Sequence, residues 1–576
     1  MGAFSSATVA STLLFLTLLP HTAEQARIER GPYLQIGTPE GIVVRWNTNL
    51  PTDSVVWYGP TPDTLDTFVR ESALTTEHEV LLSGLSPDTR YHYGVGSSAG
   101  LLAGGDGEHF FTTAPPVGTR KATRIWVIGD SGTADRNAAA VRSAYLDFTG
   151  DRPTDVWLML GDNAYGDGTD REYQAAVFAM YPSLLRTTVL WPTFGNHDAN
   201  SASSLGQVGP YYDIFTLPKN GEAGGVPSGT EAYYSFDYAN IHFVCLDSSE
   251  SASLPAMGNW LTEDLAATTQ EWIIAYWHHP PYSKGSHDSD TDGNLIEMRR
   301  RYNPILEDAG VDLVLGGHSH SYERSFLLDG HYGSSETLDA SMILDAGNGR
   351  PGEEGSYKKP TEGLAGHEGT VYVVAGSSGK TSGGDFDHEA MYIALEELGS
   401  LVLDVAGSRL DATFLDDRGR IRDTFTILKG AATLPAPSDL EATLVSERTV
   451  ELSWQDNSEG EERFKIERSS DDNRWEVVAV VGADVTNYTD REVEGGQTYF
   501  YRLRADSQTA NSPYTPIVVV KTGTTLPCGF FPRGAAAPLP LLLLLLPILL
   551  PASCTMSSTR GRGDWHPGRE RERRHS

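Results

Sequence analysis

The chain has 576 residues and a formal net charge of −33, and 39% of its residues are hydrophobic. This length exceeds what one hydrophobic core supports, so we expect about three or four folded units. The acidic excess excludes nucleic acid as a partner, because a phosphate backbone needs a basic footprint. It would also repel a phosphate substrate, so an anion site here needs local positive charge, which bound cations supply efficiently.

Near the start of the chain, residues 11–26 form the apolar stretch STLLFLTLLPHTAEQA, which ends in small residues. This arrangement is typical of a secretory signal peptide, and we expect residues 1–26 to be removed. The rest of the chain is then expected outside the cytoplasm, either secreted or at the cell surface.

Residues 27–116 contain short alternating hydrophobic runs, such as GIVVRWNT and TRYHYGVG, and the pattern returns over residues 438–522 in TVELSWQD and QTYFYRLRA. This spacing predicts two all-β sandwiches. Both segments resemble the fibronectin type III pattern, which has a Trp in an early strand and a Tyr-x-Tyr pair in a later one. These residues are Trp46, Tyr91 and Tyr93 in the first segment and Trp454, Tyr499 and Tyr501 in the second. The Pro/Ala-rich residues 429–437 are interpreted as a linker.

Residues 121–428 follow a different pattern, in which continuous apolar runs alternate with helical stretches. The stretches DRNAAAVRSAYLDF, GNWLTEDLAATT and NLIEMRRRYNPILEDAG are the expected helices. Continuous apolar strands between helices predict an α/β layered domain with sheets buried on both faces. The last part, residues 400–428, predicts an antiparallel meander instead.

Five apolar runs of this middle segment end in polar clusters, namely GDSG, GDNAYGDG, GNHD, HHPPY and GHSHSYER. Because ligand sites of open α/β sheets lie at the carboxyl ends of the strands, we expect these clusters to converge. Oxygen and imidazole donors without a thiolate suit a hard to borderline cation. Two adjacent cations need a bridging carboxylate, and two histidines one residue apart can reach different ions. We therefore interpret His318 and His320 as serving one metal each.

The order of these clusters resembles the metallophosphoesterase superfamily, which has a calcineurin-like fold, and within it the purple acid phosphatases. The superfamily pattern at the first cluster is Asp-x-His, whereas this chain has Asp130-Ser-Gly132 together with Tyr165. A tyrosinate in place of a histidine is the purple variant. The resemblance covers roughly residues 27–428.

The resemblance implies a dinuclear metal centre. The first position would hold a ferric ion and the second zinc, manganese or ferrous iron. The implied ligands are Asp130, Tyr165 and His320 for the first metal, Asp162 as the bridge, and Asn196, His278 and His318 for the second.

The expected reaction is attack of a metal-activated hydroxide on a phosphate monoester, as in an acid phosphatase. His197 is the expected general acid at the leaving oxygen, and Asp198 is expected to orient its imidazole. Asn196, His197 and His287 are the candidate substrate-binding residues. Of these, His287 is the only close histidine in SKGSHDSDTDG, where plant-type relatives place phosphate-contacting histidines.

Two alternatives remain open at this stage. The same centre could serve a phosphodiesterase or nucleotide pyrophosphatase, or the chain could be a non-catalytic surface adhesion protein. Residues 523–576 contain a leucine-rich segment followed by arginines, which predicts a membrane anchor or a sorting signal. The second sandwich is interpreted as a spacer or a module that binds surface or matrix components.

Overall fold

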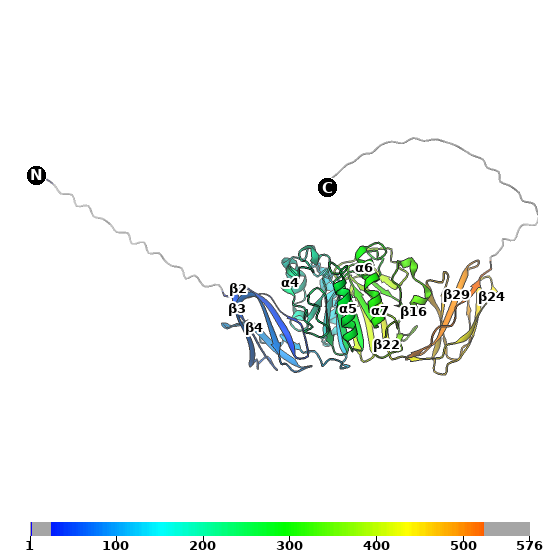
Figure 1. The fold of residues 1–576 in the computed structure, drawn as a ribbon, viewed down its shortest axis with the longest axis horizontal. Coiled ribbons are helices and arrows are strands. Elements are labelled where there is room, and N and C mark those ends of the chain that lie inside the picture. The colour runs from blue at the N-terminus through cyan, green and yellow to red at the C-terminus, as the bar shows by residue number, and fades with distance from the viewer. Residues whose placement is uncertain (1, 3–24, 524–576) are drawn as a thin grey trace, which may run out of the picture. The chain divides into compact units, whose positions relative to one another are not determined.

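The computed structural model describes residue 2 and residues 25–523 (Figure 1). The predicted anchor and nearly all of the predicted signal peptide lie outside these described residues. Among the described residues, no helix has the length and apolar character that crossing a membrane requires.

Residues 28–112 form an all-β domain of six strands. The strands are β1 (Ile28–Gln35), β2 (Gly41–Gly59), β3 (Thr67–Ser83), β4 (Arg90–Ser97), β5 (Gly100–Gly104) and β6 (Phe110–Thr112). The first half of β2 pairs with β1 and β3, and its second half pairs with β3 and β4. One continuous hydrogen-bonded sheet therefore wraps the core that contains Trp46 and Tyr93, where two separate sheets were expected.

The central segment contains two seven-stranded sheets, which confirms the expected α/β class. In spatial order the first sheet is β10 (Tyr234–Tyr238), β11 (Ile241–Cys245), β12 (Trp272–Trp277), β13 (Leu313–Gly316), β18 (Val371–Ala375), β14 (Tyr322–Ser325) and β19 (Met391–Leu395). The second is β17 (Tyr357–Lys359), β22 (Ile421–Lys429), β21 (Arg409–Asp416), β20 (Gly399–Ala406), β7 (Thr123–Ile128), β8 (Val156–Met159) and β9 (Leu190–Pro192). Strands β20, β21 and β22 form the predicted antiparallel meander.

Successive side chains of β12 lie in two different hydrophobic cores, and this shows how the layers are assembled. Ile274 and Tyr276 belong to the core that also contains strands of the second sheet, whereas Ile273 and Trp277 belong to a core that includes helix residues. Since successive side chains of a strand point to opposite faces, this sheet is buried on both sides. The fully apolar sequence WIIAYW reflects that double burial.

The helices of the central segment are mostly short. They are α1 (Arg136–Thr149), α2 (Asp170–Tyr173), α3 (Pro182–Leu185), α4 (Pro210–Ile214), α5 (Pro255–Ala267), α6 (Gly293–Arg301) and α7 (Asn303–Ala309). The segment also contains the helical turns η1 (Gln174–Phe178), η2 (Asp198–Asn200), η3 (Ser335–Thr337) and η4 (Ala340–Met342). A short strand pair, β15 (Leu327–Leu328) and β16 (Ile343–Asp345), completes the segment. The stretch NLIEMRRRYNPILEDAG is divided between α6 and α7, because Pro304 cannot continue a helix that precedes it.

Residues 438–521 form a sandwich of two sheets. One sheet contains β24 (Ser438–Ser446), β25 (Thr449–Gln455) and β28 (Asn487–Asp490), and the other contains β23 (Ala432–Thr433), β26 (Arg463–Ser469), β27 (Trp475–Gly482), β29 (Thr498–Asp506), β30 (Ala510–Asn511) and β31 (Val518–Lys521).

The same kind of tyrosine hydrogen bond occurs inside each of the two β domains. The hydroxyl of Tyr91 accepts the backbone N–H of Ser86, and that of Tyr499 accepts the N–H of Glu494, in each case from five residues earlier. The repeated Tyr-x-Tyr pattern therefore has the same local function in both domains.

The terminal sandwich is joined to the central segment by buried contacts that the Pro/Ala-rich sequence does not predict. Residues 432–433 of the predicted linker form β23 and pair with β30. Asp345 accepts hydrogen bonds from Lys465, at 2.6 Å, and from Arg504. Trp475 is 1% exposed and belongs to the core that contains Ile273. A free spacer would lack such contacts.

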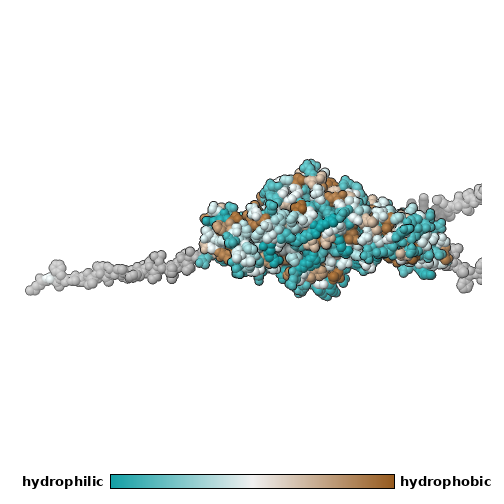
Figure 2. All heavy atoms as spheres, turned by 90° about the horizontal axis from the view of Figure 1, so that it is seen from below, coloured by the Kyte–Doolittle hydropathy of each residue, from teal (hydrophilic) through white to brown (hydrophobic). Residues whose placement is uncertain are grey.

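Hydrophobic residues on the face drawn in Figure 2 lie in small separate groups among hydrophilic ones. Phe68 and Leu74, at 60% and 74% exposure, are examples of exposed apolar side chains in the described residues. Scattered exposure of this kind is normal for a folded protein.

Candidate metal centre

The loops that follow β7, β8, β9, β12 and β13 bring together all the predicted metal ligands. β7, β8 and β9 belong to one sheet and β12 and β13 to the other, so the site lies where both sheets end. Asp130, Asp162 and His318 have positive φ angles of 54°, 51° and 64°. Non-glycine residues rarely adopt this left-handed conformation, and its strain is often found at functional sites.

The donors predicted for the first metal lie within hydrogen-bonding distance of one another. The hydroxyl of Tyr165 is 2.9 Å from Oδ1 of Asp130 and 3.4 Å from Nε2 of His320. Nε2 of His320 is 3.5 Å from the same Asp130 oxygen. The other ring nitrogen of His320 contacts the hydroxyl of Ser382 at 3.0 Å, which fixes the ring orientation.

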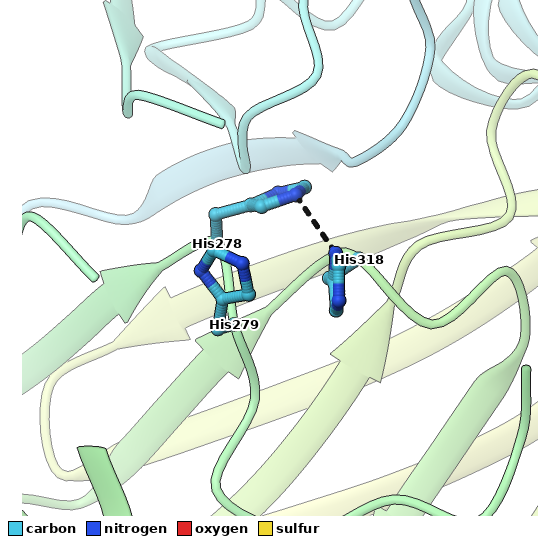
Figure 3. A group of neighbouring side chains, drawn as sticks. All are labelled: His278, His279 and His318. Carbon is cyan, nitrogen blue, oxygen red and sulfur yellow. Dashed lines mark hydrogen bonds between the residues drawn. The ribbon is translucent and has the colours of Figure 1, made fainter. Parts of the chain in front are cut away.

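The donors predicted for the second metal are equally close. Oδ1 of Asn196 is 2.9 Å from Nε2 of His278 and 2.9 Å from Nδ1 of His318, and these two nitrogens are 3.2 Å apart (Figure 3). Oδ1 of Asp162 is 3.3 Å from Nε2 of His278. Ligand atoms of Asp130, Asp162 and His278 all lie within 4.8 Å of one another, so Asp162 stands between the two groups.

The chemistry of this donor set fits cations. Nδ1 of His278 faces the carbonyl of Leu160 at 2.8 Å and must donate to it, so in the neutral ring, the form that binds a metal, Nε2 carries a lone pair. That lone pair faces Oδ1 of Asn196, which is also an acceptor. Nε2 of His318 is buried and has no hydrogen-bond partner within the described part of the chain. Facing lone pairs in a buried site are unfavourable unless a cation lies between them.

Burial and charge set the protonation of the first group. Burial raises the pKa of Tyr165 far above its ordinary value, and the nearby Asp130 and Asp162 raise it further. Burial also opposes ionisation of Asp130, but a hydrogen bond from His320 and the charges of nearby histidines lower its pKa to about 2. A tyrosinate at this position therefore depends on a bound cation.

His197 lies beside this centre, and its orientation differs from the prediction. Its Nδ1 donates to the carbonyl of Gly166 at 2.5 Å, and its Nε2 is 3.8 Å from Oδ2 of Asp162. Asp198 accepts hydrogen bonds from Tyr173, from the backbone of Gly195 and from Asn163. The expected contact between Asp198 and the imidazole is therefore wrong, because this carboxylate is occupied in joining the GDNAY and GNHD loops. Burial, followed by the charge of Asp162, raises the pKa of Asp198 to about 7.

His287 lies against the second group. Its ring centroid is 3.7 Å from that of His318, and its Nδ1 is 3.6 Å from Oδ2 of Asp292. The same oxygen is 3.7 Å from Nε2 of His318. Sequence reasoning missed Asp292, because an aspartate that caps a helix in an acidic loop carries no motif.

His279 lies beside the second group of donors, with a ligand atom within 4.8 Å of ligand atoms of His278 and His318 and its ring centroid 4.3 Å from that of His318. Its Nδ1 contacts Ser248 at 2.8 Å and its Nε2 contacts Asn294 at 3.3 Å. In Figure 3 its ring and that of His278 point in different directions from adjacent positions. Each ring nitrogen of His278 also has a contact, so the choice of His278 over His279 as ligand stays a prediction.

Comparison with known proteins first gives the class of the fold. Residues 123–322 match the calcineurin-like phosphoesterase family. A solved purple acid phosphatase from yellow lupin seeds has a TM-score of 0.53 and 18% identity over 69% of this chain and 74% of that structure. This likeness confirms the predicted fold of the central segment.

The comparisons then point to a narrower group. Residues 30–113 match the purple acid phosphatase N-terminal domain, directly before the phosphoesterase match. Purple acid phosphatase 21 of Arabidopsis thaliana is 29% identical over 50% of this chain and 62% of its own length. Phosphoenolpyruvate phosphatase of Allium cepa is 27% identical over 53% of this chain and 63% of its own length. The chain thus spans somewhat less than two thirds of these relatives, and the resemblance to purple acid phosphatases is confirmed.

Proposed function

We propose that the chain is a phosphatase of the purple acid phosphatase type, which hydrolyses phosphate monoesters at a dinuclear metal centre. The main support is the position of Asp162 between two converging groups of oxygen and imidazole donors. An adhesion protein with an inert middle domain would not need buried donors whose lone pairs face one another.

The proposed occupants are a ferric ion and a zinc, manganese or ferrous ion. Bound together, they would neutralise phosphoryl oxygens and acidify a shared solvent molecule. The proposed ligands are Asp130, Tyr165 and His320 at the first position, Asp162 between the two, and Asn196, His278 and His318 at the second.

The side chains around the centre have separate proposed roles. His197 acts as general acid, because its Nδ1 donates to Gly166 and Nε2 is left to meet the leaving oxygen. Its side chain is 33% exposed, which leaves the ring accessible to a substrate. Asn196 and His287 supply hydrogen bonds to the phosphoryl group. Asp198 supports the site by holding two loops together and does not contact the reacting atoms.

The test uses the full chain loaded with iron and zinc. We expect p-nitrophenyl phosphate to be hydrolysed faster than bis(p-nitrophenyl) phosphate. His197→Ala is expected to lower turnover by about 10²–10⁴-fold, the usual contribution of a general acid, with both metals still bound. His367→Ala, at a histidine that is 56% exposed and remote from the centre, is the matched control and should leave turnover unchanged.

The outcomes separate the alternatives. Faster hydrolysis of the diester would favour the phosphodiesterase or nucleotide pyrophosphatase function. Loss of metal from His197→Ala would contradict its assigned role, and absence of hydrolysis by the loaded wild-type chain would contradict the proposal itself.

The cellular location and the domain boundaries also belong to this proposal. We propose a cleaved signal at residues 1–26, an N-terminal domain at 27–116, a catalytic domain at 121–428, a terminal sandwich at 438–522 and a membrane or sorting segment at 523–576. Binding of surface or matrix components by the sandwich is a further part of the proposal, suggested by its resemblance to fibronectin type III domains. The mass of the mature protein and cell fractionation test the two terminal assignments.

A further inference from the structure

Lys380 lies at the edge of the candidate centre on a segment of fixed backbone. The segment follows β18 and is tied to the metal-site loops by three hydrogen bonds. Gly376 N donates to Ser321 O at 3.2 Å, Ser378 N to Gly129 O at 3.1 Å, and Ser382 N to His320 O at 3.2 Å. The backbone at Lys380 is therefore positioned by the same loops that carry the predicted ligands.

The ammonium of Lys380 lies over the ring of Tyr165. Its Nζ is 3.8 Å from the ring centroid, and the side chain is half-buried. A ring face attracts a cation, but it leaves most of the three N–H donors of a lysine without an acceptor. The ammonium therefore has hydrogen bonds still to offer.

Within the described part of this strongly acidic chain, Lys380 also lacks a carboxylate partner. Among the described residues, no Asp or Glu oxygen lies within 4.0 Å of its Nζ. Apart from the exposed Lys521, the other lysines form ion pairs with Asp or Glu: Lys121, Lys219, Lys284, Lys358, Lys359, Lys429 and Lys465. A free ammonium at the rim of a site rich in carboxylates is available to an external anion.

An anion bound to Lys380 would lie on the leaving-group side of the centre. The ring of His197 meets the same Tyr165 ring edge-on, with centroids 4.5 Å apart. His197 is the proposed general acid at the leaving oxygen, so Lys380 and the leaving group adjoin one aromatic ring.

We propose that Lys380 is a specificity-determining residue that binds a second anionic group, a carboxylate or a phosphate, carried by the leaving group of the substrate. This inference rests on the proposed phosphatase function and narrows its substrate class. A lysine that only supported the Tyr165 ring would not distinguish leaving groups by their charge.

Binding of non-hydrolysable probes to the metal-loaded full chain tests the inference. Methylphosphonate has no second anionic group, phosphonoacetate adds a carboxylate, and methylenediphosphonate adds a phosphonate. Calorimetry at low salt should show that Lys380→Met weakens phosphonoacetate and methylenediphosphonate about tenfold, as expected for loss of one charge-assisted hydrogen bond, and methylphosphonate less than about twofold. Whichever of the two probes loses more affinity identifies the preferred group.

Two further variants complete the design. Lys380→Arg keeps the charge and should restore most of the affinity for the two probes that carry a second anionic group. Lys521→Met removes the same charge from an exposed position in β31 and should change nothing. In kinetics, Lys380→Met should raise KM for 3-carboxyphenyl phosphate, leave its kcat unchanged, and leave phenyl phosphate unaffected.

Equal weakening of all three probes by Lys380→Met, or no weakening of any, would overturn the inference. A wild-type chain that hydrolyses neither ester would contradict the proposed function, and a Lys380-dependent preference for the probes in that chain would show that Lys380 binds a second anionic group independently of catalysis.

Discussion

Replacement of Trp475 by alanine should destabilise both the terminal sandwich and the catalytic domain. The indole is 1% exposed and lies in the core that contains Ile273 of β12, and the guanidinium of Arg502 lies 4.4 Å from its ring centroid. A buried Trp removes about 200 Å² from water, worth about 5 kcal/mol at ~25 cal/mol per Å² as an upper value. With partial collapse of the cavity, we expect unfolding to become easier by about 3–5 kcal/mol.

Amide hydrogen exchange measures this effect in each domain separately. One peptide should cover α5 in the catalytic domain and another should cover β29 in the sandwich. Because Trp475 belongs to a core shared with the helices, Trp475→Ala should lower the opening free energy of both peptides together. Val519→Ala, at a residue of β31 that is 57% exposed, is the control and should change it by less than about 0.5 kcal/mol.

A different exchange pattern would refute this reasoning. If only β29 lost protection while α5 kept its wild-type value, the sandwich would be an independent module. The buried ion pairs of Asp345 would then have no role in joining the two domains.

Two further predictions concern the centre and the pH dependence of stability. A Cβ at position 195 would lie 2.4 Å from Oδ1 of Asp162, so Gly195→Ala should displace this carboxylate. The variant should therefore bind less metal than the wild type, as measured by atomic emission. Gly107→Ala, which would meet nothing within 4 Å, is its control, and full metal content in Gly195→Ala would contradict the bridging role. Burial lowers the pKa of His242, but hydrogen bonds to Asp237 and Asp264 outweigh it and raise the pKa to about 9. The stability from this raised pKa is complete below the unfolded value near 6.5 and is lost as pH rises through 9. Denaturation at pH 6 and pH 9.5 should show a loss of about 2–4 kcal/mol in wild type that His242→Gln lacks, and equal losses in both proteins would contradict it.

Much of the fold and the convergence of the site could be predicted from the sequence, because they depend on strong local patterns. Apolar runs that end in Gly-Asp, Gly-Asn or His-Pro can be recognised from sequence alone. Because ligand sites of open α/β sheets lie at the carboxyl ends of the strands, these run ends were expected to meet. The Trp and Tyr repeats likewise indicated two β domains. The individual ligand roles stay predictions until a metal is observed.

The remaining contacts could not be predicted because they join distant or unremarkable residues. Gly166 holds His197 through a backbone carbonyl, which has no sequence signal, so Asp198 was the natural but wrong choice. Lys380 and Asp292 are single charged residues in polar loops. Trp475 appears in sequence as an ordinary core residue of its own sandwich, and only packing shows that it serves a neighbouring domain as well.

The central claim is that two cations share Asp162. The most direct test is a crystal structure of the iron- and zinc-loaded protein with anomalous scattering recorded at both metal edges. We expect two peaks, an iron peak among Asp130, Tyr165 and His320 and a zinc peak among Asn196, His278 and His318, both in contact with Asp162. A single peak, or peaks that do not contact Asp162, would contradict it.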